Sequence, residues 1–178
     1  MRSLTLFRLD HRTVRDQRIT SHVALTARAL GCQHFIYSGE RDPNMEQSIR
    51  DVVSRWGGSM EVEHTTSIRG IISGFDGIVV HLTMYGEDHR NTIATLEEYP
   101  DEPILLVVGG PKVPRYVYSL ADLNTAIGWQ PHSEVAATGI FMRELLGTDP
   151  LYHNYPDAKI SINGTGSKAQ RSERFKSN

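Results

Sequence analysis

Residues 104–108, Ile-Leu-Leu-Val-Val, constrain the fold more than any other segment of the chain. Successive side chains of a strand point to opposite faces, so a run that is apolar at every position predicts a strand buried on both faces. Such strands lie inside parallel sheets that helices cover on both sides. The rest of the chain must therefore supply further parallel strands and the helices that cover them.

Shorter apolar runs and alternating patterns predict the other strands. They lie at residues 4–9, 35–37, 60–65 and 77–83, with one more short segment at 126–128. Residues 10–20 are predicted as a loop, and apolar residues at helical spacing predict helices that start after Thr20 or Ser21, at Asp42-Pro43, near Ile68, at His89 and at Glu134. Because strands and helices alternate, the sequence predicts an α/β fold, a parallel sheet with helices on both faces.

The domain organisation follows from where this alternation stops. A length of 178 residues suits one ordinary domain, which we assign to residues 1–148. Asp149-Pro150 breaks the pattern, and the segment 149–166 is predicted as an extension with a β-hairpin that turns at Asn163-Gly164. Residues 167–178, rich in Ser, Lys and Arg, are predicted as a flexible basic tail.

Composition excludes several classes of protein. The single cysteine, Cys32, excludes a disulfide framework and any zinc site built from several cysteines. The eight histidines do not cluster at ligand spacing, so no metal site is expected. No apolar run reaches the roughly 18 residues that a membrane helix needs. The nucleotide-binding, metalloprotease and hydrolase motifs GxGxxG, GxxxxGK[ST], HExxH and GxSxG are absent. We therefore expect a soluble, intracellular protein.

An arginine cluster precedes the first predicted helix. Arg8, Arg12, Arg15 and Arg18 lie within eleven residues of one another, with Asp10 and Asp16 as the acidic residues between them. The planar guanidinium group binds phosphate through two parallel hydrogen bonds, so this cluster is a candidate nucleic-acid contact. A solvated basic surface is an equal alternative on residue type alone.

Three predicted loops follow strands and are candidates for a ligand site, because parallel sheets bind ligands at the carboxyl ends of their strands. They span residues 82–88, 109–115 and 128–133. Gly109-Gly110 lets backbone approach a ligand closely, and Ser133 can cap the last helix, whose first N–H groups are also free to bind a ligand. His132 next to Ser133 suggests a serine hydrolase, but adjacent residues rarely face each other and no third partner is evident.

Four blocks in the same order resemble a known family. They are His11 to Ala29, HLTMYG at 81–86, KVP at 112–114 and QPHSEVA at 130–136. Together they resemble the archaeal tRNA (cytidine(56)-2'-O)-methyltransferases, members of the SPOUT superfamily of S-adenosylmethionine-dependent RNA methyltransferases. The resemblance implies a C-terminal trefoil knot in the α/β fold, a following β-hairpin, a cytoplasmic homodimer and transfer to tRNA without a metal or a membrane.

The resemblance also assigns residues to roles. Arg28 matches the arginine of the first SPOUT motif, near the target ribose, and is the expected catalytic residue; an exposed helical arginine is the alternative. His22 stands where related ribose methyltransferases carry Asn, and with Arg8, Arg12, Arg15 and Arg18 it is expected to contact RNA. The expected S-adenosylmethionine contacts are Leu82, Gly109, Gly110, Pro111, Lys112, Val113, Ile127, Gly128, Trp129, Gln130, Pro131, His132, Ser133 and Glu134. Pro111 and Trp129 depart from the family pattern, which has Glu and Asn there.

Two other functions remain open at this point. One is a SPOUT methyltransferase that acts on another RNA nucleotide, and the other is a non-catalytic RNA-binding member of the fold. The retained Arg28 and the intact block 130–136 favour an active enzyme.

Overall fold

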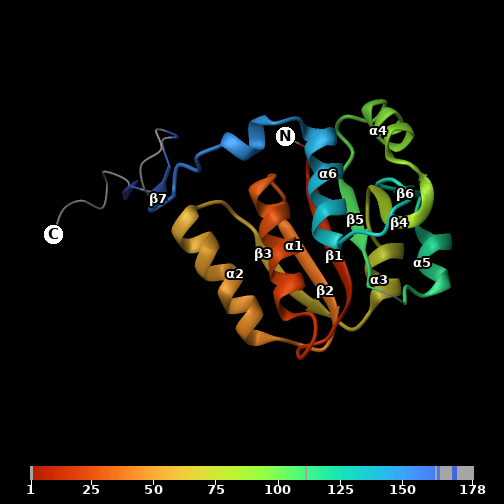
Figure 1. Cartoon of the computed structure of the whole chain (residues 1–178), viewed down its shortest axis with the longest axis horizontal. Coiled ribbons are helices and arrows are strands. Elements are labelled where there is room, and N and C mark those ends of the chain that lie inside the picture. Colours follow the sequence, from red (N-terminus) through yellow and green to blue (C-terminus); the bar gives the residue numbers. More distant parts are fainter. Residues whose placement is uncertain (1, 111, 163, 165–169, 172–178) are drawn as a thin grey trace.

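The computed structural model describes residues 2–110, 112–162, 164 and 170–171. Its centre is a six-stranded sheet in the order β3-β2-β1-β5-β4-β6, in which every neighbouring pair is parallel (Figure 1). The strands are β1 (Leu4–His11), β2 (His34–Gly39), β3 (Glu61–Thr65), β4 (Ile78–Asp88), β5 (Ile104–Val108) and β6 (Leu123–Ala126). The strand β5 is buried at all five positions and lies between β1 and β4, which confirms the predicted α/β fold.

Helices cover both faces of this sheet. They are α1 (Gln17–Ala29), α2 (Pro43–Trp56), α3 (Ile68–Ser73), α4 (His89–Glu97), α5 (Arg115–Leu120) and α6 (Glu134–Leu146). The helix α1 lies between α2 and α6 on one face, as Figure 1 shows, while α3 packs beside α5 and their residues belong to the core of the other face. Each face of the sheet therefore has its own apolar core.

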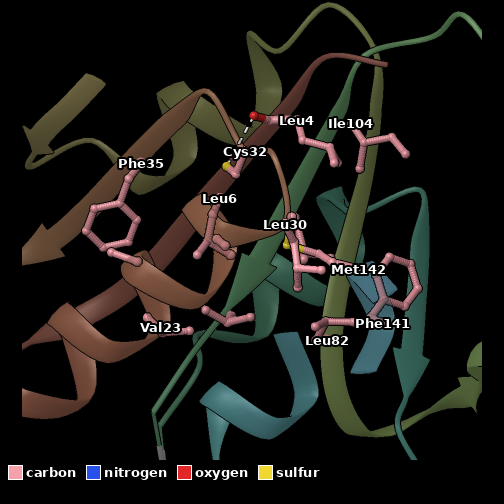
Figure 2. Close-up of a cluster of buried hydrophobic side chains, with 14 of the residues drawn as sticks. Leu4, Leu6, Val23, Leu30, Cys32, Phe35, Leu82, Ile104, Phe141 and Met142 are labelled. Carbon is pink, nitrogen blue, oxygen red and sulfur yellow. Dashed lines mark hydrogen bonds between the residues drawn. The ribbon is translucent and has the colours of Figure 1, made fainter. Parts of the chain in front are cut away.

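The larger core lies beneath α1 and α6. Leu4 and Leu6 of β1 meet Val23 of α1 and Phe141 of α6 there (Figure 2). The thiol of Cys32 lies at the edge of this core and donates to the carbonyl oxygen of Leu4 over 3.2 Å. Burial raises the pKa of Cys32 to about 12, so the group stays a protonated thiol and packs as a small apolar side chain.

The structure corrects two predicted boundaries and adds one helix. The helix α1 begins at Gln17, and Thr20 lies inside it with its hydroxyl 2.8 Å from Nδ1 of His11. Polar side chains within residues 10–20 thus bond to one another. The polar sequence of this segment predicted a solvated loop and gave no sign of these contacts. The last strand lies at Leu123–Ala126, before the predicted 126–128. The helix α5 was not predicted, because six residues are too few to show helical periodicity.

The parallel pairing of β4 with the edge strand β6 is interrupted by a bulge. Leu82 and Glu87 both pair with Thr125, so residues 83–86 bulge out of β4. A Cβ atom on Gly86 would lie 2.4 Å from the backbone nitrogen of Thr125, so only glycine fits there. The bulge turns this segment toward the carboxyl edge of the sheet. The trefoil knot that the resemblance implies stays a prediction.

The C-terminal extension packs against the far end of α2. A 3₁₀ turn (Asp149–Tyr152) leads to Tyr155, which lies against Gly57 and Gly58, and Asp157 accepts from the backbone N–H of Gly58. The predicted hairpin is present as β7 (Ile160–Ser161) paired antiparallel with β8 (Gln170–Arg171).

The second strand of this hairpin lies in the segment that was predicted as tail. Residues 162–169 separate the two strands, so the connection is longer than a two-residue turn at Asn163-Gly164. The rest of the predicted tail, residues 172–178, lies outside the described residues. Among the described residues, no helix has the length and apolar character to cross a membrane.

Because β5 is buried on both faces, a valine-to-alanine substitution should destabilise the protein more in β5 than at an exposed position. Val107 is 0% exposed and Val14 is 95% exposed. Val107→Ala leaves a cavity in the core, so we expect the free energy of unfolding to fall by about 2 kcal/mol or more. Val14→Ala should change it by less than about 0.5 kcal/mol. Urea unfolding measures both, and equal costs would contradict the central position of β5.

Candidate active site

A pocket of about 490 Å³ lies at the carboxyl edge of the sheet. Residues of all three predicted loops line it, although the segment 82–88 belongs to β4 and reaches the pocket through its bulge instead of forming a loop. Arg12, Arg15 and Asp16, which follow β1, also line the pocket. Eleven of the fourteen expected cofactor residues line this pocket: Leu82, Gly109, Gly110, Val113, Ile127, Gly128, Gln130, Pro131, His132, Ser133 and Glu134. Lys112 and the exposed Trp129 do not line it, and Pro111 lies outside the described residues.

Backbone geometry opens the pocket and starts the helix behind it. A Cβ atom on Gly110 would have Glu134 Oε1 as its nearest neighbour, at 3.8 Å, so the backbone there faces free space. The hydroxyl of Ser133 accepts from the N–H of Ala136 over 3.2 Å, which confirms Ser133 as the cap of α6. Nε2 of His132 lies 2.7 Å from the carbonyl oxygen of Ile127, so this histidine fixes the loop before α6.

The structure adds pocket residues that the sequence did not assign. Thr83, Met84 and Tyr85 line the pocket from the β4 bulge, and Tyr118 lines it from α5. The first three had a sequence signal, because they lie in the segment 82–88 that was a candidate ligand loop. Tyr118 had no such signal, since the short helix α5 was itself not predicted.

His81 lines this pocket and keeps one buried ring nitrogen without a partner among the described residues. Nδ2 of Asn124 donates to the carbonyl oxygen of Tyr118, so Oδ1 of Asn124 is the atom 2.9 Å from Nδ1 of His81 and accepts its proton. Nε2 is then unprotonated, and it has no hydrogen-bond partner among the described residues. Burial lowers the pKa of His81, so the imidazole is neutral at pH 7.

Arg8 is not an exposed loop residue. It lies in β1, is 1% exposed, and donates from Nε to Glu134 Oε2 over 3.1 Å. Its Nη2 lies 3.9 Å from Asp16 Oδ2. Arg8 lines the pocket although little of the residue is accessible, and the expectation that it contacts RNA stays a prediction.

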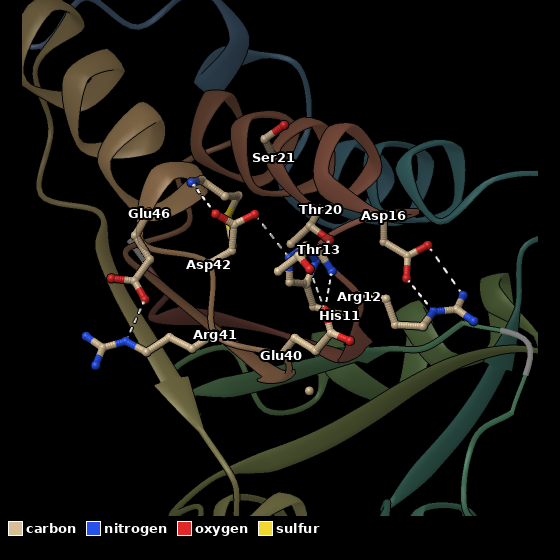
Figure 3. Close-up of polar contacts among 12 residues, drawn as sticks. His11, Arg12, Thr13, Asp16, Thr20, Ser21, Glu40, Arg41, Asp42 and Glu46 are labelled. Atoms are coloured by element: carbon tan, nitrogen blue, oxygen red, sulfur yellow. Dashed lines mark hydrogen bonds and ion pairs between the residues drawn. The ribbon is translucent and has the colours of Figure 1, made fainter.

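The remaining arginines of the cluster divide into two groups. Arg12 and the exposed Arg15 line the pocket, and Arg12 binds Asp16 through two bonds of 2.8 and 3.4 Å (Figure 3). Arg18 and His22 are exposed on α1 and do not line the pocket. The bond from Arg12 lowers the pKa of Asp16, so this carboxylate stays charged.

A second polar cluster lies below the segment 12–16 and is closed to substrates. His11 lies 2.8 Å from the Thr20 hydroxyl and 3.4 Å from Asp42 Oδ2, an arrangement that resembles a nucleophile, base and acid (Figure 3). All three side chains are buried, so no substrate reaches the hydroxyl. Asp42 also caps α2, accepting from the N–H of Met45. The cluster therefore fixes the end of β1 between α1 and α2.

Arg28 lies at the other end of α1. Eleven residues of helix separate it from Gln17, which places it about 16 Å from the pocket end of α1. Its Nη2 donates to the carbonyl oxygen of Gly57, and its guanidinium group lies 5.4 Å from the ring centroid of Tyr155. Within one chain, the structure does not bring Arg28 together with the residues of the pocket.

Comparison with known sequences identifies the family of this chain. The profile of a family described as tRNA ribose 2'-O-methyltransferase, aTrm56, matches residues 56–170. The chain belongs to this family. A tRNA (cytidine(56)-2'-O)-methyltransferase of Methanocaldococcus jannaschii is 48% identical over 160 residues, 88% of this chain and 89% of that protein. The enzyme of the same name from Thermococcus kodakarensis is 45% identical over 163 residues, 89% and 91% of the two chains.

Solved structures agree on the fold of the family. The A. aeolicus TrmH/SpoU tRNA modifying enzyme matches with a TM-score of 0.61 at 18% identity, over 82% of this chain and 75% of that chain. The SpoU methyltransferase AviRb from Streptomyces viridochromogenes, solved in complex with AdoMet, matches with a TM-score of 0.59 at 17% identity, over 82% and 57%. This chain of the aTrm56 family therefore has the SpoU methyltransferase fold.

The described part of the chain holds no group of three or more His, Cys, Asp or Glu residues arranged to bind a metal ion. The charged groups nearest to the pocket are instead arginines and carboxylates. Burial raises the pKa of Glu134, and the neighbouring Arg8 acts in the opposite direction. In this family member the candidate site is thus formed by loop backbone, paired charges and a neutral imidazole.

The neutral imidazoles predict a pH dependence of stability. Burial lowers the pKa of both His11 and His81, so below about pH 6.5 the unfolded chain binds more protons than the native one. The free energy of unfolding should therefore fall as the pH drops from 7.5 to 5.5. His81→Gln should flatten this dependence in urea unfolding, with His22→Gln at an exposed position as the control. An equal slope in wild type and His81→Gln would contradict a buried neutral His81.

Proposed function

We propose that this protein transfers a methyl group from S-adenosylmethionine to the ribose 2'-hydroxyl of cytidine 56 in tRNA. One observation carries the proposal: the segments that the family resemblance assigns to the cofactor line the same pocket. Leu82 and the loops at 109–113 and 127–134, which the resemblance assigns to the cofactor, meet at the carboxyl edge of the sheet. Two arginines, Arg12 and Arg15, also line this pocket, and their charge suits an RNA backbone.

The residues present fit the cofactor. The volume of about 490 Å³ is within the usual range for a small-molecule site, roughly 300–1,000 Å³. The backbone at Gly110 leaves room for a ligand to approach, and two residues of the pocket lining, His81 and Arg8, each carry a buried polar atom without a partner among the described residues. Apolar Leu82, Val113 and Ile127 supply surface for a flat heterocycle such as adenine.

The work left to this chain is positioning. The cofactor supplies a methyl group that its sulfonium already activates, so the acceptor oxygen needs an in-line approach and a route for its proton. Holding two reactants in that geometry lowers a barrier by up to roughly 7–11 kcal/mol. Arginine does not deprotonate readily, with a pKa above roughly 12, so Arg12 and Arg15 suit binding of the phosphates next to the target ribose rather than acting as a base.

The proposed target implies where the enzyme works and what must happen to the tRNA before the reaction. A tRNA substrate implies a cytoplasmic enzyme. The target ribose must also reach a pocket at the sheet edge, which costs a few kcal/mol of unstacking when the nucleotide is paired or stacked. The rim arginines can offset part of this cost by phosphate contacts.

The proposed acceptor oxygen is tested by one tRNA transcript. With radiolabelled S-adenosylmethionine and EDTA present, an unmodified transcript should incorporate label at position 56. A transcript with 2'-deoxycytidine at that single position keeps the base and removes only the acceptor, so its labelling should be lost. Undiminished labelling of the second transcript would exclude the 2'-oxygen as acceptor.

The role of Arg28 leads to a further prediction. We infer from the resemblance that the protein is a homodimer in which Arg28 of one subunit serves the pocket of the other, because Arg28 does not line its own pocket. Arg28→Ala and Gly110→Phe should each inactivate a homodimer. After subunit exchange, a 1:1 mixture should regain about a quarter of wild-type activity, since half the dimers then hold one intact site.

Mass analysis and the separate variants serve as controls for that mixture. Light scattering should give a dimer for both variants alone and mixed. A monomer, or a mixture as inactive as its components, would contradict transfer of Arg28 between subunits and leave Arg28 as the contact that anchors Tyr155 of the extension.

A further inference from the structure

Arg8 is the most buried cation of the pocket lining, and one of its N–H donor groups has no acceptor among the described residues. It lines the pocket at 1% exposure, and its Nη1 atom has no hydrogen-bond partner among the described residues. A buried charged donor without an acceptor is costly, so such atoms in native proteins are normally satisfied by water or a ligand. The unused donor of Arg8 therefore indicates an acceptor that the chain itself does not supply.

The other two nitrogens fix how the guanidinium group is oriented. Nε is held by Glu134 at the first turn of α6, and Nη2 lies 3.9 Å from Asp16, the N-cap residue of α1. Arg8 thus sits between the starts of two helices, each of which adds a partial positive charge. One more anion at this point would be favoured by Arg8 and by both helix ends.

Glu134 provides the opposite charge on the same wall. Its side chain is about one-fifth exposed, lines the pocket, and has Oε1 facing the open space beside Gly110. Arg8 and Glu134 are adjacent, one a donor with a free N–H and the other an acceptor with a free oxygen direction. An adjacent cation and anion complement a ligand that carries an anion and a cation on neighbouring atoms, as the end of a free amino acid does.

We propose that Arg8 and Glu134 bind the amino-acid end of the methyl donor, with Arg8 Nη1 donating to the α-carboxylate and Glu134 accepting from the α-ammonium group. This inference rests on the proposed function, which identifies the donor as S-adenosylmethionine. An RNA phosphate does not suit this position, because Arg8 is buried behind Asp16 while Arg12 and Arg15 stand on the wall at greater exposure. Arg8 is thus a cofactor-binding residue in β1, outside every loop that the sequence assigned to the cofactor.

Calorimetry with two ligands tests the carboxylate contact. Wild type should bind S-adenosylmethionine roughly 10- to 100-fold more tightly than its decarboxylated analogue, the range expected for a hydrogen bond to a charged group. Arg8→Met should bring this ratio close to one. Arg55→Met, the same change at an exposed residue of α2, should leave the ratio as in wild type.

A second cycle leaves Arg8 intact and so does not depend on the folding of Arg8→Met. Wild type should prefer S-adenosylmethionine over the analogue that lacks the α-amine, and Glu134→Gln should lose most of that preference. Retention of both preferences in both variants would overturn the proposal. Equal affinity of wild type for the decarboxylated ligand would also overturn it, as would a ratio that survives Arg8→Met and disappears in Arg12→Ala or Arg15→Ala.

These results separate the subsite from the proposed function. If wild type binds S-adenosylmethionine and methylates tRNA but does not distinguish the analogues, only the Arg8–Glu134 subsite is rejected. If wild type neither binds S-adenosylmethionine nor labels tRNA, the proposed function is rejected, and the subsite with it.

Discussion

The burial of β5 on both faces decides where this protein can carry polar chemistry. A strand that is apolar at all five positions needs helices above and below it, so neither face of the sheet is available for a ligand. The edge of the sheet where the parallel strands end is then the available place, and the loops that follow β4, β5 and β6 meet there. The pocket is a direct consequence of the packing of the core.

Charge pairing at that edge resolves a conflict between burial and electrostatics. Arg8 lies in β1 on the face that α1 and α6 cover, in line with the apolar Leu4 and Leu6. A bare cation between two helix N-termini would be repelled by both helix dipoles. Asp16 and Glu134 supply the carboxylates at those two helix starts; Arg8 pairs with Glu134, and Arg12 pairs with Asp16. The network is neutral as a whole, and it joins the end of β1 to the starts of α1 and α6 at the pocket.

The sequence predicted the parts of the fold that have a strong local pattern. β5, the capped start of α2 and the full span of α6 follow from apolar runs, Asp42-Pro43 and Ser133. The start of α1 was misplaced because Thr20 bonds to His11 nine residues earlier, a contact between polar side chains that no local pattern encodes. The burial of Arg8 was not predictable for the same reason, since its carboxylate partner Glu134 is 126 residues away. Most loop residues that line the pocket were predictable from the family blocks, whereas the tertiary partners that fix them were not.

The position of Arg28 shows why a motif match does not by itself locate a residue in a site. Its match lies in the helix after β1, and the start of that helix does border the pocket, at Ile19. A helix that runs back along the sheet carries its last turn to the opposite edge, where Arg28 meets Gly57 and Tyr155 of the extension. An arginine at this edge can serve a pocket only if a second copy of the chain brings the two edges together. A catalytic role for Arg28 therefore depends on the contact between two subunits.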